Sequence, residues 1–188
     1  MGKEEEAEAS FRKAIALQPD RWQTHNFLGT LLDRQKRHQD AIAEYEQGLR
    51  LRPDEPTLLN NSGLAYYLLG RYEEAVQSFQ RALLTGSAQP KIHNNLGLAL
   101  AKLNRYQDAL ESFRRAGSEE EAYNNLGVFY LSSGKAGNAI ACFKKAIELS
   151  PRYYEKANDN LTLAKRSLEK HKKTGEKSST ASPSVCPS

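Results

Sequence analysis

The chain has 188 residues, of which 39% are hydrophobic and 27% are charged, with a formal net charge of +4. This composition predicts one soluble, extended domain, and no apolar run is long enough to span a membrane. The six basic and two acidic residues from Lys165 onward account for the whole net charge. The rest of the chain is therefore neutral, and it lacks the basic body expected of a nucleic-acid-binding protein.

A 34-residue period runs through the chain. Aromatic residues recur at Phe11, Tyr45, Phe79, Phe113 and Phe143, and alanines recur four residues earlier, at Ala7, Ala41, Ala75, Ala109 and Ala139. A second series consists of Gly29, Gly63, Gly97 and Gly127. The last interval in each series is 30 residues and the others are 34. Such self-similarity predicts stacked repeats, each of which buries its apolar face against the next.

The first complete unit begins at Trp22, and its apolar residues follow offsets of three, four and seven. Those offsets place them on one stripe of each of two helices. Glycine costs about 1 kcal/mol relative to alanine inside a helix, so its recurrence needs a structural reason. We expect Gly29 to face Ala41, so that the two helices approach closely and Tyr45 fills the space below.

With this period and this alternation of small and large residues, residues 5 to 168 resemble the tetratricopeptide repeat family. The resemblance implies an all-α, right-handed superhelical solenoid of antiparallel helix pairs, with about ten helices. A half repeat occupies residues 1–19, and four repeats over residues 20–151 comprise about 22–55, 56–89, 90–119 and 120–153. A polar capping helix follows at 152–172, and a basic, Ser- and Pro-rich tail at 173–188 is expected to be disordered.

Two units depart from the pattern. The chain opens with a second helix that has no first-helix partner, which fits an excised fragment or a natural half repeat, and we expect the partly uncovered face with Phe11 and Ile15 to favour a dimer. The unit from Pro90 is four residues short, so its second helix should lose about one turn. Ser118 and Glu121 then form a capping-box pattern that begins the next helix.

The sequence shows no motif for catalysis, metal binding or cofactor binding. Cys142 and Cys186 are too few and too scattered for a disulfide framework or a zinc site. His25 and His93 occupy equivalent repeat positions, which predicts packing roles for both. The compartment stays open, since the cytoplasm and the periplasm both fit.

The first helices should line a concave groove with recurring asparagines. A carboxamide both donates and accepts hydrogen bonds, so these side chains suit either a neighbouring helix or the backbone of an extended peptide; the sequence leaves both alternatives open. Apolar residues one turn further along would contact peptide side chains. The predicted groove residues are Asn26, Asn60, Asn61, Leu64, Tyr67, Lys91, Asn94, Asn95, Leu98, Asn124, Asn125, Val128, Leu131 and Asn160. Lys91 alone has the charge of the carboxylate clamp known in this family, which argues against a chaperone-tail site.

These features predict a non-enzymatic scaffold that binds a protein or an extended peptide in its groove. Short segments around Ala116–Gly127 and Tyr153–Leu161 are similar to bacterial pilus-assembly and secretion-associated repeat proteins. One alternative is the substrate-recruiting region of a larger enzyme, as in protein O-linked N-acetylglucosamine transferases. Another is an architectural subunit that uses its convex faces.

Overall fold

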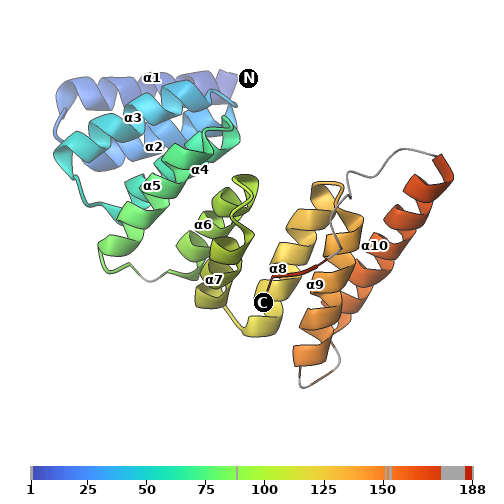
Figure 1. The fold of residues 1–188 in the computed structure, drawn as a ribbon. Helices are drawn as coiled ribbons and strands as arrows, with labels where there is room; N and C mark the ends of the chain where they lie inside the picture. The colour runs from blue at the N-terminus through green and yellow to red at the C-terminus, as the bar shows by residue number, and fades with distance from the viewer. Residues whose placement is uncertain (1, 88, 151, 153, 175–184, 188) are drawn as a thin grey trace. The chain divides into compact units, whose positions relative to one another are not determined.

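The computed structural model describes residues 2–87, 89–150, 152, 154–174 and 185–187. Within these ranges the chain forms ten α-helices and no strand, an all-α solenoid of helix pairs (Figure 1). The helices are α1 (Gly2–Leu17), α2 (Trp22–Arg34), α3 (His38–Leu51), α4 (Pro56–Leu68), α5 (Tyr72–Leu84), α6 (Pro90–Lys102), α7 (Tyr106–Ala116), α8 (Glu119–Ser132), α9 (Ala136–Leu149) and α10 (Glu155–Thr174). They divide into two compact units, residues 1–99 and 100–188.

In the first unit, α2 pairs with α3 and α4 pairs with α5, while α3 packs against α4. The core between these helices includes Leu28, Leu32, Ile42, Tyr45 and Leu58, each of which is at most 2% exposed. In the second unit, α9 packs against both α8 and α10. Ala157 and Ala164 of α10 are fully buried, so the terminal helix has an apolar face on the stack.

Three of the repeated glycines, Gly29, Gly63 and Gly127, lie directly against the aromatic ring of their own repeat. A Cβ atom added to Gly29 would lie 2.5 Å from Cε1 of Tyr45, and one added to Gly63 would lie 2.7 Å from Cε1 of Phe79. Gly127 has the same relation to Phe143, at 2.5 Å. The ring, rather than the alanine that we expected opposite the glycine, is therefore what excludes a larger side chain.

Several local features of the helices match the sequence prediction. Pro56 and Pro90 are the first residues of α4 and α6. Helix α7 has 11 residues, against 13 or 14 in α3, α5 and α9. Ser118 Oγ accepts a hydrogen bond from the Glu121 N–H, and the Glu121 carboxylate accepts one from the Ser118 N–H, which completes the capping box that begins α8.

The C-terminal end differs from the sequence prediction. Helix α10 begins at Glu155 and ends at Thr174, whereas the sequence predicted a cap over 152–172. Residues 185–187 of the predicted tail are described, and Cys186 forms a disulfide with Cys142. The sequence did not predict this pairing, because the two cysteines are 44 residues apart and only the fold brings them together. Residues 175–184 and 188 lie outside the described part of the chain.

Helix α1 packs against α2 through partly buried Phe11 and Ile15. The Phe11 ring stacks on that of Phe27 with centroids 6.1 Å apart, and Phe27 remains 55% exposed. The Glu8 carboxylate accepts a hydrogen bond from Arg37 at 2.8 Å, which adds a polar tie between α1 and the turn before α3. The dimer expected through this end stays a prediction.

The turn inside each repeat contains one residue with left-handed backbone geometry. These residues are Lys36, Gly70, Asn104 and Gly134, with φ values of 62°, 77°, 60° and 74°. They follow the same repeat spacing as the glycines of the first helices. Glycine adopts this geometry without steric cost, whereas a lysine side chain costs roughly 1–2 kcal/mol there.

Replacing Lys36 by glycine should therefore raise the free energy of unfolding. The substitution removes the backbone strain from the folded chain, and it also increases the conformational entropy of the unfolded chain. The first effect is the larger one, so we expect the free energy of unfolding to rise by about 0.5 to 1 kcal/mol. Chemical denaturation followed by circular dichroism measures it. The matched control is Lys13→Gly at an exposed position inside α1, which should instead cost about 1 kcal/mol. Equal losses at both positions would contradict the assigned turn geometry.

Candidate functional site

Asparagines of three successive first helices form a continuous hydrogen-bonded chain in the first unit. Asn61 Nδ2 on α4 donates to Asn26 Oδ1 on α2 at 2.9 Å. Asn60 Nδ2 donates to Asn61 Oδ1 at 3.3 Å, and Asn95 Nδ2 on α6 donates to Asn60 Oδ1 at 3.0 Å. One of the two alternatives from the sequence, a bond to a neighbouring helix, is thus present in the structure.

Burial separates the asparagines that a ligand can reach from those that it cannot. Asn60 is 6% exposed and Asn124 is 1% exposed, so both lie beneath the surface. A second contact of the same kind joins α8 and α10 of the other unit, where Asn160 Nδ2 donates to Asn124 Oδ1 at 3.0 Å. The other predicted asparagines are partly exposed, and they are Asn26, Asn61, Asn94, Asn95, Asn125 and Asn160.

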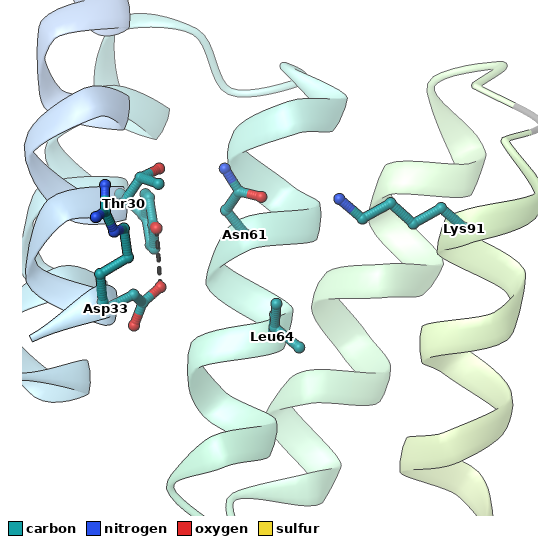
Figure 2. A pocket seen from close by; sticks show the side chains of 7 residues that line it. Thr30, Asp33, Asn61, Leu64 and Lys91 are labelled. Atoms are coloured by element: carbon teal, nitrogen blue, oxygen red, sulfur yellow. Dashed lines mark hydrogen bonds between the residues drawn. The ribbon is translucent and has the colours of Figure 1, made fainter. Parts of the chain in front are cut away.

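The chain of asparagines borders a pocket in the first unit with a volume of about 330 Å³. Three predicted groove residues line it: Asn61 and Leu64 of α4, and Lys91 of α6. Figure 2 shows the Lys91 side chain extending from α6 toward Asn61. The remaining lining residues come from α2 and α3, and they are Thr30, Asp33, Arg34 and Tyr45.

The polar groups contributed by α2 and α3 are tied to the protein. Asp33 Oδ2 accepts a hydrogen bond from the Tyr45 hydroxyl at 2.9 Å, and Asp33 Oδ1 lies 2.9 Å from Nδ1 of His38. Burial raises the pKa of the Tyr45 phenol, and the neighbouring Asp33 carboxylate also raises it, so the hydroxyl stays protonated and donates. The Thr30 hydroxyl donates to the Asn26 carbonyl at 2.8 Å. The contacts with Tyr45 and His38 occupy both oxygens of the Asp33 carboxylate with partners inside the protein.

Two cationic side chains lie at the edge of the same pocket. Lys91 is exposed, and it makes no ion pair with any residue in the described part of the chain. Arg34 is 71% exposed, and its only ion pair among described residues is a long one, 3.7 Å, to Glu4. A ligand that enters the pocket therefore meets positive charge at the rim, an apolar contact at Leu64 and a carboxamide at Asn61.

The other apolar residues predicted for the groove differ in their contacts and in their exposure to solvent. The Tyr67 ring packs against Tyr72 with centroids 5.5 Å apart, and burial raises the pKa of its phenol. Leu98 of α6 is partly exposed. In the second unit, Val128 is 43% exposed and Leu131 is partly exposed, both on α8. These side chains are accessible, but they do not line the described pocket.

Sequence reasoning missed the contributions of α2 and α3 to this pocket. Thr30 and Asp33 follow Asn26 at offsets of four and seven, which places all three on one helix face. That spacing was a usable signal. Tyr45 carried no such signal, because its place in the repeat marks it as a core aromatic; in the structure its hydroxyl donates to Asp33, another lining residue.

A second hollow, of about 500 Å³, lies near the C-terminal end of α5. Its lining residues are Asp54, Arg81, Leu84 and Thr85. None of them belongs to the predicted groove, and Arg81 donates to the backbone carbonyl of Pro53 at 3.2 Å. We therefore take the pocket at Asn61 as the candidate site, although it is the smaller of the two.

The described residues contain no cluster of three or more side chains suited to hold a metal ion. Among the described helices, none combines the length and apolar character needed to cross a membrane.

Comparison with known proteins identifies the repeats. Family models for the tetratricopeptide repeat match residues 1–56, 90–119 and 120–153, and a TPR repeat model matches residues 63–104. Together these matches span most of the chain. No curated protein sequence matches it significantly.

Several solved structures share the fold. A crystal structure of MamA is 19% identical, covers 92% of each chain and has a TM-score of 0.64. YrrB, described as a TPR protein with an unusual peptide-binding site, is 24% identical, with a TM-score of 0.62 over 86% of this chain and 94% of its own. A tetratricopeptide repeat protein from Parabacteroides merdae is 22% identical, with a TM-score of 0.66 over 92% of this chain and 73% of its own.

The asparagine chain should contribute to stability through the buried Asn60. We expect Asn60→Ala to lower the free energy of unfolding by about 1 to 3 kcal/mol, because it leaves the Asn61 acceptor and the Asn95 donor without their partner. In a double-mutant cycle, the combined loss for Asn60→Ala and Asn95→Ala should be smaller than the sum of the single losses by at least about 0.5 kcal/mol. Gln77→Ala on the exposed face of α5 is the control, with an effect within about 0.5 kcal/mol. Strict additivity of the two asparagine changes would rule out the contact.

Proposed function

Because this chain belongs to the tetratricopeptide repeat family, we propose that it is a non-enzymatic scaffold that binds an extended peptide segment on the inner face of its first unit. Proteins of this fold present surfaces to partners, and a protein-interaction role follows for the chain. The proposal locates that role at the pocket formed by α2, α3, α4 and α6. The observation that carries it is the convergence of Asn61, Leu64 and Lys91, from two successive first helices, on one hollow.

The chemistry of the pocket suits a peptide backbone with mixed side chains. Asn61 uses one N–H of its amide for the bond to Asn26, and a carboxamide nitrogen has two. The second N–H suits a peptide carbonyl. Leu64 offers an apolar contact one turn further along α4, and Lys91 adds a donor with positive charge. An extended peptide presents backbone groups that form hydrogen bonds and side chains of differing character, and the amide, apolar and cationic groups of the pocket can contact both.

The hydrogen-bonded asparagines of the first unit also have an indirect part in this proposal. They join α2, α4 and α6, and so they hold the residues that contact the ligand at a constant spacing. A site held by packed helices loses little entropy on binding, because its side chains are already ordered. YrrB is described as binding peptide at an unusual site, and the proposal extends peptide binding, though not the details of that site, to this chain.

Peptide selection on the full chain tests the proposal. A phage library of random linear peptides is selected against the immobilised protein, and the recovered peptides are measured in solution by fluorescence anisotropy. We expect Lys91→Glu and Leu64→Ala each to weaken binding by about tenfold, through reversed charge and lost apolar contact respectively. Both residues are outside the asparagine chain, so folding should be retained.

Lys144→Glu, at an exposed position on α9, is the matched charge control and should leave the affinity unchanged. Thermal unfolding of every variant separates a lost contact from a lost fold. If the selected peptides bind Lys91→Glu and Leu64→Ala as tightly as the unaltered chain, the pocket is not the binding site. If they respond to Lys144→Glu instead, the binding surface lies in the second unit.

A further inference from the structure

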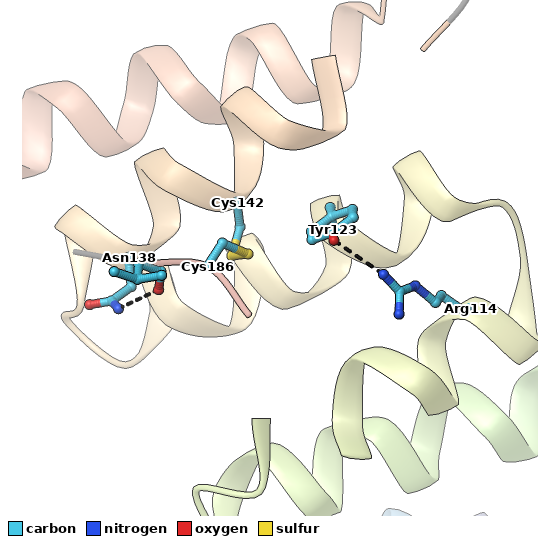
Figure 3. Close-up of a disulfide and its surroundings, with 6 residues drawn as sticks. Arg114, Tyr123, Asn138, Cys142 and Cys186 are labelled. Atoms are coloured by element: carbon cyan, nitrogen blue, oxygen red, sulfur yellow. Dashed lines mark hydrogen bonds between the residues drawn. A yellow bond between two sulfur atoms is a disulfide. The ribbon is translucent and has the colours of Figure 1, made fainter. Parts of the chain in front are cut away.

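The disulfide between Cys142 and Cys186 returns the C-terminal residues to the second unit. The two Cα atoms are 5.0 Å apart, which is within the usual range for a disulfide. Cys142 lies on α9 and is fully buried. A second contact supports the same placement, since Asn138 Nδ2, one turn earlier on α9, donates to the backbone carbonyl of Val185 at 2.9 Å (Figure 3).

The position of the two cysteines along the chain gives this bond a particular consequence. They are 44 residues apart, and the whole of α10, residues 155–174, lies between them. The covalent loop therefore encloses α10, whose contacts among the described helices are with α9 and α8. A helix with packing partners on one side opens locally more readily than one that is packed between two neighbours.

We propose that the Cys142–Cys186 disulfide is a redox-sensitive clamp that holds α10 on α9. In the oxidised chain the disulfide restricts the separation of α10 from α9. A cross-link reduces the number of conformations that α10 and its flanking residues can adopt once the helix has separated. In the dithiol form α10 depends on its own packing, through Ala157, Ala164 and the Asn160 hydrogen bond to Asn124. Disulfides persist in oxidising compartments and are reduced in glutathione-rich ones, so the same chain has a clamped and an unclamped state.

The clamp also acts on the inner face of the second unit. Asn124 is 1% exposed, and its Oδ1 accepts a hydrogen bond from Asn160 on α10. When α10 separates, that buried oxygen loses its partner. Redox state is therefore coupled to the asparagine contact between α8 and α10. This inference rests on the disulfide and the packing of α10, and it stands or falls independently of peptide binding in the first unit.

Formation of the clamp requires a disulfide-containing oxidant, for which glutathione disulfide serves. The Cys186 thiolate attacks one sulfur of glutathione disulfide, which forms a mixed disulfide and releases one glutathione. The Cys142 thiolate then attacks the Cys186 sulfur, which closes the protein disulfide and releases the second glutathione. Each thiol loses its proton to solvent, and the two electrons reduce glutathione disulfide to two glutathione molecules, which take up those protons.

Hydrogen exchange on the full chain tests the clamp. The protein is equilibrated with glutathione disulfide or with a reducing phosphine, and amide exchange is followed by mass spectrometry. On reduction we expect exchange over α10 to accelerate at least about tenfold, and the Tm of the second unit to fall by roughly 5 to 10 °C. Helices α2 to α5 should show no change. Mass spectrometry of alkylated protein should find an intramolecular Cys142–Cys186 link in the oxidised sample.

Cys186→Ser is the control, because it keeps the buried Cys142 and the packing of α9. We expect it to exchange like the reduced chain in both buffers. If Cys142→Ser unfolds the second unit, Cys186→Ser alone decides the matter. The proposal is overturned if both thiols remain free in glutathione disulfide, if Cys186 forms only intermolecular disulfides, or if α10 exchanges at the same rate in both redox states.

Discussion

The contact between a helix glycine and the aromatic ring of the paired helix is the constraint on which the structure depends. Gly29 meets Tyr45, Gly63 meets Phe79 and Gly127 meets Phe143, with no room for even one added carbon. The rings are at most 1% exposed, so the whole face of each ring is in contact with protein. Packing this close determines the distance between the two helices of a repeat. It also determines where the opposite face of the first helix lies, and the hydrogen-bonded asparagines are on that helix.

The asparagines show how one residue type can serve both the fold and a site. Asn95 on α6 donates to the buried Asn60 on α4, and Asn61 on α4 donates to Asn26 on α2, so these bonds connect three successive first helices. A carboxamide that bonds within the protein still has donor and acceptor capacity left, so the structural role does not exclude contact with a peptide. What distinguishes the pocket is the addition of Leu64, Lys91 and Arg34 around this chain. The wider groove of the sequence analysis, including Val128 and Leu131, stays a prediction, as does the similarity to pilus-assembly proteins.

Sequence periodicity predicted the fold because each repeat buries the same kinds of side chain at the same positions of its two helices. The helix starts at Pro56 and Pro90, the short α7 and the capping box at Ser118 follow from local rules of proline geometry and helix capping. The disulfide was missed because it depends on where the chain returns after α10, which no periodic signal encodes. Three residues of the predicted groove line the same pocket. Asn61, Leu64 and Lys91 follow from repeat register, whereas Arg34 and the Tyr45 hydroxyl depend on how neighbouring repeats meet.

The most direct measurement of the central constraint is a double-mutant cycle at Gly63 and Phe79, read out by equilibrium unfolding. In the unaltered background, Gly63→Ala forces the Phe79 ring to move and should cost about 1 to 3 kcal/mol. With Phe79→Leu, a smaller and more flexible side chain faces the new methyl group, and the cost of Gly63→Ala should fall below about 1 kcal/mol. If Gly63→Ala costs the same in both backgrounds, the ring does not determine the helix separation, and the account given for the repeat is wrong.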